Sequence, residues 1–324
     1  MQNAKQVFSS AKNSTVVRSS SSQEWIRNGL RVGLQLLHRT APDLASLAAE
    51  RLFRSPRRHA RPAWEQEILA GATRFRIPWG AETLPAWSWG KGPTVLLVHG
   101  WEGRGSQLGA FVEPLVEMGY RVVTFDSPGH GDAPGRHATV VEIAGAVSAA
   151  LAELGPVHAI IAHSVGGPAT TYALSRTAGH PPRVAFIAPP TSAIRFTKAF
   201  ASTLGLAEDA RLRLVARLEE RYGIPLTDLE ATRHAPRMTS QLLVVHDHDD
   251  REVPFEAGAT LADHWPGSRL VATRGLGHRR ILRAPQVIDA VLELVAGAPF
   301  SMRTGLARFG LERELFERER RRAA

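Results

Sequence analysis

Short, almost continuous apolar runs that alternate with helical patterns constrain the fold of this chain more than any other feature. The runs are rich in Val, Ile and Leu, which is typical of strands that are buried on both faces of a sheet. Strands that alternate with helices predict the α/β class, with a mostly parallel central sheet and helices on both of its faces. The runs lie at residues 94–100, 121–126, 158–164, 183–190, 241–247 and 268–273.

Helical patterns separate most of these runs, and two further strand patterns precede them. Residues 73–79 and 84–89 are expected to form antiparallel strands at an edge of the sheet. The expected helices lie at residues 105–118, 138–154, 166–178, 255–265 and 285–296.

The remaining segments differ in composition from this alternating core. Residues 191–240 lack a strand pattern, and because they follow the end of a strand we expect a helical lid there. Residues 24–64 predict a helical extension, broken near Pro42, which suits a helix start. Its first helix has a rough apolar face made by Trp25, Leu30, Leu34 and Leu37. We expect a disordered Ser-rich tail at 1–23, an α/β domain at 65–300 and a basic helix or tail at 301–324.

Composition excludes several classes of function. Cysteine is absent, so disulfides, thiolate nucleophiles and cysteine-based metal sites are excluded, and a reducing, cytoplasmic location is expected. No apolar stretch is long enough for a membrane span, and the N-terminus lacks the apolar region of a secretory signal. Because no phosphate-binding or dinucleotide-binding motif occurs, we expect no cofactor.

The chain is basic, with 40 Lys and Arg against 31 Asp and Glu, a formal net charge of +9. Arginines recur along the whole chain instead of forming one block, so we expect a solvated basic surface and no nucleic-acid partner. Two local clusters, at residues 51–61 and 318–322, leave contact with an anionic surface open.

A single serine stands where the third apolar run turns into a helical segment, in the stretch AHSVGG. In open α/β sheets, ligands bind beyond the carboxyl ends of the strands, and Ser164 lies at such an end. A sharp turn would expose its hydroxyl group and would require small neighbours, here Ala162 and Gly166. The alternative is a serine that caps the helix, and the motif alone does not decide between the two.

Taken together with four other segments, this serine motif makes the chain resemble the α/β-hydrolase family from about residue 65 to residue 297. AHSVGG is similar to the family's G-x-S-x-G motif, with Ala162 in place of the first glycine. The other matching segments are VLLVHGW (95–101), FDSPGHGDAPG (125–135), DHDDREVP (247–254) and GLGHRRIL (275–282).

This resemblance implies an α/β-hydrolase fold with a helical lid and a set of catalytic roles. Ser164 would be the nucleophile, His278 its base, and Asp250 the acid that orients the histidine. The backbone N–H groups of Trp101 and Val165 would form the oxyanion hole. The expected function is a cofactor-free and metal-free serine hydrolase, carboxylesterase-like or lipase-like, that cleaves an ester, thioester or amide of a small acyl substrate.

Three aspartates follow one strand, so proximity alone does not choose the acid among Asp247, Asp249 and Asp250. The resemblance selects Asp250 through its spacing to Val253 and Pro254, and Asp247 is expected to cap the turn.

Other functions remain open at this stage. The stretch HDHDD (246–250) could ligate a metal ion in a metal-dependent hydrolase. A non-catalytic binding protein on the same fold is a second alternative, and acyltransferase, lyase or haloperoxidase chemistry could use the same triad. The sequence leaves the substrate and the oligomeric state open.

Overall fold

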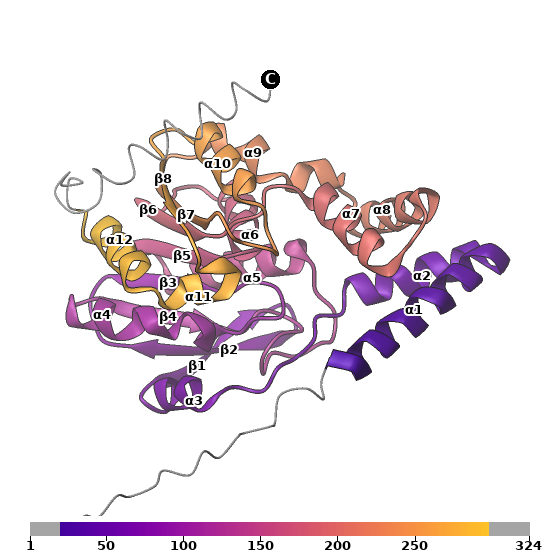
Figure 1. The fold of residues 1–324 in the computed structure, drawn as a ribbon. Coiled ribbons are helices and arrows are strands. Elements are labelled where there is room, and N and C mark those ends of the chain that lie inside the picture. The colour runs from indigo at the N-terminus through magenta and orange to yellow at the C-terminus, as the bar shows by residue number, and fades with distance from the viewer. Residues whose placement is uncertain (1–19, 298–324) are drawn as a thin grey trace, which may run out of the picture.

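In the computed structural model, which describes residues 20–297, an eight-stranded sheet runs through the centre of the molecule (Figure 1). The strand order is β1-β2-β4-β3-β5-β6-β7-β8. Strands β3 to β8 are parallel to one another, whereas β1 and β2 are antiparallel to their neighbours. The strands are β1 Thr73–Trp79, β2 Glu82–Trp89, β3 Thr94–Val98, β4 Arg121–Phe125, β5 Ala159–His163, β6 Arg183–Ile187, β7 Gln241–Asp247 and β8 Arg269–Thr273.

All six apolar runs form parallel strands of this sheet, so that prediction is confirmed. The prediction of two edge strands is wrong for β2, which pairs with β1 on one side and with β4 on the other. Burial explains the position of β2, because Leu84, Ala86 and Trp87 are covered inside the molecule.

Side chains of the parallel strands alternate between two apolar cores, one on each face of the sheet. In β3, Leu96 and Val98 pack into the core that α5, α6 and α10 cover. Val95 and Leu97 pack into the opposite core, under α4 and α12. Strands that are buried on both faces are expected to be mostly apolar, as the inner strands β3 to β7 are. The covering helices are α4 Val112–Glu117, which follows the 3-10 turn η1 Gly105–Phe111, α5 Val140–Leu154, α6 Gly166–Leu174, α10 Phe255–His264 and α12 Pro285–Ala296.

The N-terminal extension forms a helical hairpin, followed by the short helix α3 (Ala63–Ala70). Helix α1 (Ser20–Thr40) ends at the expected break, and α2 (Pro42–Phe53) begins with Pro42 in its first turn. Because α1 begins at Ser20, the end of the expected tail is helical. The rest of that tail, residues 1–19, and the whole C-terminal stretch 301–324 lie outside the described residues.

The expected apolar face of α1 is only partly correct. Leu34 is buried and Leu37 is half-buried, but Trp25 is 79% exposed and Leu30 also faces solvent. The buried face of α1 is determined by its contacts with α2 and with α7 (Ala193–Leu204). The sequence of α1 alone does not show where these two helices pack.

Residues 191–240 contain no strand, as expected, and their two long helices α7 (Ala193–Leu204) and α8 (Glu208–Tyr222) lie beside the N-terminal hairpin (Figure 1). Helix α8 packs against α2, and α7 packs against α1. In α8, Leu214 and Leu218 are buried, whereas Leu212 is exposed. The elements are α7 Ala193–Leu204, α8 Glu208–Tyr222, η2 Leu226–Leu229, α9 Ala231–His234 and η3 Ala235–Arg237.

Candidate active site

Ser164 lies in a strained turn between β5 and α6. Its φ angle is +51°, a left-handed conformation that is costly for a residue with a side chain. A Cβ atom on Gly100 would lie 2.8 Å from the Cβ of Ser164, and one on Gly166 would lie 2.8 Å from the backbone oxygen of His99. The turn therefore requires the small residues that surround it in the sequence, and it holds the serine at the carboxyl edge of the sheet.

His278 and Asp250 lie in line with this serine. The Nε2 atom of His278 is 3.0 Å from the Oγ of Ser164, and its Nδ1 is 2.7 Å from the Oδ2 of Asp250. All three residues are buried. Because a carboxylate only accepts hydrogen bonds, Nδ1 carries the proton and the lone pair of Nε2 faces the hydroxyl group. This arrangement can remove a proton from Ser164.

Asp250 is held as an ionised acceptor. Its other oxygen, Oδ1, accepts hydrogen bonds from the backbone N–H groups of Glu252 (2.8 Å) and Val253 (2.9 Å). Burial raises the pKa of Asp250, but hydrogen bonds from His246, His278 and the Val253 N–H group outweigh burial and hold that pKa below its ordinary value. The carboxylate therefore stays charged at neutral pH.

The two neighbouring aspartates stabilise the loops of the site. Asp247 accepts hydrogen bonds from the Thr273 hydroxyl (2.6 Å) and the Leu276 N–H group (3.1 Å). Asp249 accepts one from the N–H group of Gly275 (2.8 Å). Both carboxylates thus bind the turn that precedes His278, and Asp247 has the capping position that we expected.

Trp101 and Val165 belong to the two segments that meet at the serine turn: Val165 follows Ser164, and Trp101 follows Gly100, on which a Cβ atom would lie 2.8 Å from the Cβ of Ser164. Neither N–H group has a hydrogen-bond acceptor among residues 20–297. The loop before Trp101 is fixed by His99, which donates from Nδ1 to the Gly100 oxygen (2.8 Å) and accepts at Nε2 from the Ser127 N–H group (2.9 Å). Burial lowers the pKa of His99 to about 4, so the ring stays neutral and keeps this pattern.

His163, the residue before Ser164, also belongs to the site, although the sequence analysis gave it no role. It donates from Nε2 to the backbone oxygen of His278 (2.9 Å), and the two ring centroids are 4.7 Å apart. Burial and the neighbouring His278 lower the pKa of His163 to about 3, so it does not compete for the proton. His163 is therefore a positioning residue for His278. The available signal was its place beside the serine at the end of a strand.

Two cavities meet at the site. A wide cleft of about 520 Å³ holds Ser164 and His278 and is lined by apolar side chains and by charged residues such as Arg279 and Arg280. A narrow pocket of about 60 Å³ lies beside it and is almost wholly apolar, and Trp101 and Phe196 line both cavities. The other residues that line the narrow pocket are Phe53, Thr139, Val140, Val165, Pro168, Pro190, Ser192, Ala193, Tyr222, Leu226 and Leu229.

The side chains of the HDHDD stretch have partners other than a metal ion. His246 is buried and donates to the Val253 oxygen (3.0 Å), and the ring of His248 stacks on Phe255 at 3.8 Å. Within residues 20–297, no group of three or more His, Cys, Asp or Glu side chains is placed to hold a metal ion. The metal-dependent alternative therefore has no support in this geometry.

The basic cluster at residues 51–61 is used inside the protein. Arg57 pairs with Glu102 (2.9 Å), and Arg61 pairs with Asp126 (2.6 Å) and also with Asp132. Arg58 donates to three backbone oxygens of the loop at 129–135. Several of these arginines thus bind the N-terminal extension to the loops around the site. The second cluster, 318–322, lies outside the described residues, and no helix among residues 20–297 is long and apolar enough to cross a membrane.

Comparisons with known proteins give a family and a fold. The model of the alpha/beta hydrolase family matches residues 95–291, well over half of the 324 residues. A search of curated proteins gave no match.

Among solved structures, the chain is similar to a bromoperoxidase from Bacillus anthracis (18% identity, TM-score 0.53), covering 69% of this chain and 100% of that one. It is also similar to an esterase from Exiguobacterium antarcticum (17%, TM-score 0.55; 69% and 100% covered). A third similar structure is a bacterial membrane phospholipase A (19%, TM-score 0.57; 83% and 98% covered). At these identities the structures support the fold alone.

Proposed function

This chain belongs to the alpha/beta hydrolase family, and from that premise we propose that it is a serine hydrolase that cleaves a carboxylic ester through an acyl-enzyme intermediate. The observation that carries the proposal is the continuous hydrogen-bond chain from Asp250 through His278 to Ser164. A thioester or an amide could enter the same chemistry, because both present a carbonyl carbon to the nucleophile.

The geometry supports a two-step reaction. As the Oγ of Ser164 bonds to the carbonyl carbon, its proton moves to the Nε2 of His278, and Asp250 stabilises the imidazolium that forms. The negative oxygen faces the N–H groups of Trp101 and Val165, each worth roughly 3 kcal/mol in comparable sites. The bond to the leaving oxygen then breaks, and His278 gives that oxygen the proton. Water repeats the sequence on the acyl-enzyme and releases the acid.

A fluorophosphonate probe tests the nucleophile. Ser164→Ala should not be labelled, because the probe bonds only to a serine whose proton a nearby base removes. Wild type and Ser202→Ala, which changes an exposed serine on α7, should be labelled equally. The measurement is in-gel fluorescence or the mass of the intact protein. Labelling of Ser164→Ala at the wild-type rate would exclude Ser164 as the nucleophile.

Chelation tests the metal-dependent alternative. Incubation with EDTA followed by desalting should leave the rate of ester hydrolysis unchanged, because the proposed reaction needs no metal ion. The measurement is the initial rate with p-nitrophenyl acetate before and after treatment. Loss of activity that Zn²⁺ or Mn²⁺ restores would favour the metal-dependent hydrolase.

We also propose that residues 191–240 act as a lid that limits substrate size. Phe196 on α7 lines both cavities and is 40% exposed, whereas Leu204 on the same helix is buried and lines neither. Phe196→Ala should therefore change the preference for acyl-chain length with little change in melting temperature. Leu204→Ala should instead lower the melting temperature and leave the preference for acyl-chain length unchanged. Activity across a p-nitrophenyl ester series and thermal unfolding measure the two effects, and an unchanged preference in Phe196→Ala would refute the lid.

A further inference from the structure

We propose that the N-terminal helix α2 completes the acyl-binding pocket, and that Phe53 at its end limits the length of a linear aliphatic acyl chain. This inference rests on the proposed function, because an acyl group is defined only for a substrate that reacts at Ser164. Helix α2 lies outside the stretch 95–291 that the family model matches. The residue that sets chain length would thus come from a segment outside that match.

The proposed mechanism indicates which cavity holds the leaving group of the ester and which holds its acyl chain. His278 must protonate the leaving oxygen, so the leaving group lies on the side of the wide cleft, which His278 lines. The narrow apolar pocket is lined by Trp101 and Val165, whose N–H groups are the proposed donors to the carbonyl oxygen, and His278 does not line it. The acyl chain is therefore directed into the apolar pocket, and the narrowness of this pocket favours an unbranched chain.

Phe53 is a wall of that pocket. Its ring lies edge-on to the rings of Phe196 and Phe200 on α7, with centroids 5.9 Å and 5.1 Å away. Such edge-to-face contacts fix the orientation of aromatic rings. Helix α2 and the lid helix α7 thus close the pocket together, and neither closes it alone.

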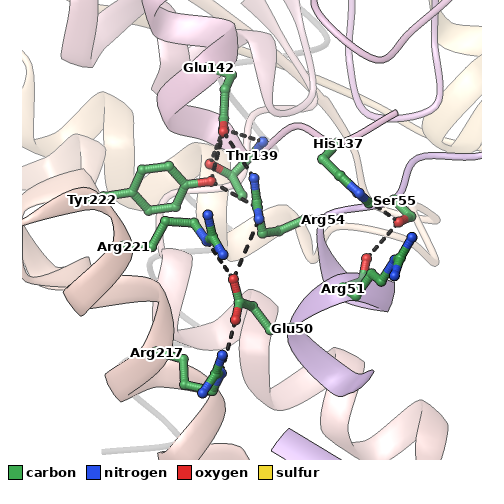
Figure 2. Close-up of polar contacts among 10 residues, drawn as sticks. All are labelled: Glu50, Arg51, Arg54, Ser55, His137, Thr139, Glu142, Arg217, Arg221 and Tyr222. Carbon is green, nitrogen blue, oxygen red and sulfur yellow. Dashed lines mark hydrogen bonds and ion pairs between the residues drawn. The ribbon is translucent and has the colours of Figure 1, made fainter. Parts of the chain in front are cut away.

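Polar contacts of Glu50 and Arg54, which stand before and after Phe53 in the sequence, hold the end of α2 in place (Figure 2). Glu50, which is buried, accepts hydrogen bonds from Arg217 (2.9 Å) and Arg221 (2.5 Å) of α8. Arg54 donates to the hydroxyl oxygen of Tyr222 (3.2 Å). These contacts join α2 to the lid, so the wall at Phe53 is fixed before a substrate enters.

Further hydrogen bonds extend this network from α8 to helix α5. The hydroxyl group of Tyr222 donates to Glu142 (2.8 Å), which in turn accepts a hydrogen bond from the N–H group of Thr139 at the start of α5 (2.7 Å). Tyr222 and Thr139 also line the pocket. Three of the segments that line the acyl pocket, α2, α8 and the start of α5, are therefore joined by one hydrogen-bond network although they are distant in the sequence (Figure 2).

A series of p-nitrophenyl esters from acetate to dodecanoate tests Phe53. In Phe53→Ala the highest kcat/KM should be found with a longer acyl chain than in wild type. The kcat/KM for the longest ester divided by that for acetate should rise about 10-fold or more, because one methylene bound in an apolar pocket changes kcat/KM by about that factor. Phe53→Trp should shift the preference to shorter chains. Leu44→Ala, on the same helix but 58% exposed and away from the pocket, should behave as wild type. Opposite shifts in the two Phe53 variants support the inference, and an unmoved preference in both overturns it.

A binding measurement separates failure of this inference from failure of the proposed function. If wild type hydrolyses no ester and takes no fluorophosphonate label, the proposed function is wrong. The pocket is then judged by the rise in melting temperature that linear carboxylic acids produce in the Ser164→Ala protein. Addition of Phe53→Ala should extend the range of acids that stabilise the protein to longer chains. An identical range with and without Phe53 overturns the inference.

Discussion

Replacement of Asp250 by Asn is expected to lower kcat for ester hydrolysis by about 10⁴ while the protein stays folded. The Oδ1 of Asp250 accepts two backbone N–H groups, from Glu252 and Val253, so the carbonyl oxygen of an asparagine would occupy that position. Its NH₂ group would then face Nδ1 of His278, where Asp250 now accepts a hydrogen bond. Nδ1 would have to lose its proton to Nε2, and a protonated Nε2 cannot take the proton of Ser164.

The two neighbouring aspartates provide matched controls for this prediction. Asp247→Asn and Asp249→Asn change residues that hold the turn before His278 without contacting its ring, so each should lose far less activity. Steady-state kinetics with one ester measure kcat, and circular dichroism shows that the variants are folded. A nearly normal Asp250→Asn beside an inactive Asp249→Asn would place the acid one residue earlier than we propose.

Glu50→Gln is expected to destabilise the protein by about 2 kcal/mol and to lower its melting temperature by roughly 5 °C. Glu50 is only 2% exposed, and it joins α2 to α8 through Arg217 and Arg221, with Arg54 at 3.4 Å. A glutamine keeps the shape of the side chain but removes the negative charge, so these cations lose their common partner. Because the arginines are partly exposed, water compensates for some of the loss, which keeps the effect below that of a fully buried pair.

The pH dependence of this effect identifies its cause. Burial raises the pKa of Glu50, but the hydrogen bonds and charges of Arg221 and Arg217 outweigh burial and lower it from 4.5. The stabilisation is therefore complete above pH 4.5 and is lost as the pH falls through the lower pKa of the folded state. The difference in melting temperature between wild type and Glu50→Gln should shrink in acid.

An exposed ion pair between the same two helices, α2 and α8, provides the control for Glu50. Asp43, 90% exposed and 3.3 Å from Arg213, forms a surface pair that contributes little to stability, so Asp43→Asn should change the melting temperature only slightly. Equal effects of Glu50→Gln and Asp43→Asn would contradict the assigned role of Glu50.

The central sheet could be predicted from the sequence because its information is local. A strand that is buried on both faces is mostly apolar, and each of the six parallel strands contains such an apolar run, although the edge strand β8 is only half-buried. The candidate residues Ser164, Asp250 and His278 could be selected for the same reason, since each lies in a short motif at a strand end. The structure brings these three side chains together because the carboxyl ends of the six parallel strands lie at one edge of the sheet.

The N-terminal hairpin could not be predicted to the same degree, because its packing depends on residues far along the chain. The apolar pattern of α1 suggested a face that runs from Trp25 to Leu37, but α2 and α7 cover only its later part at Leu34 and leave Trp25 exposed. The burial of Glu50 could not be predicted from α2 either, because its partners Arg217 and Arg221 lie on α8. No local pattern in α2 marks Phe53 as a pocket residue, since the pocket exists only after α7 has packed against it.

The contact between Glu50 and Arg217 spans 167 residues, and this separation has a consequence for the order of events during synthesis. A ribosome that adds about 5–20 residues per second completes α8 on the order of 10 to 30 s after α2 has been made. Helix α2 therefore exists for this interval without its partner on α8. Until α8 has been made, the face of α2 that packs against α8 stays exposed to solvent, and such transiently exposed surface makes a folding intermediate prone to aggregation.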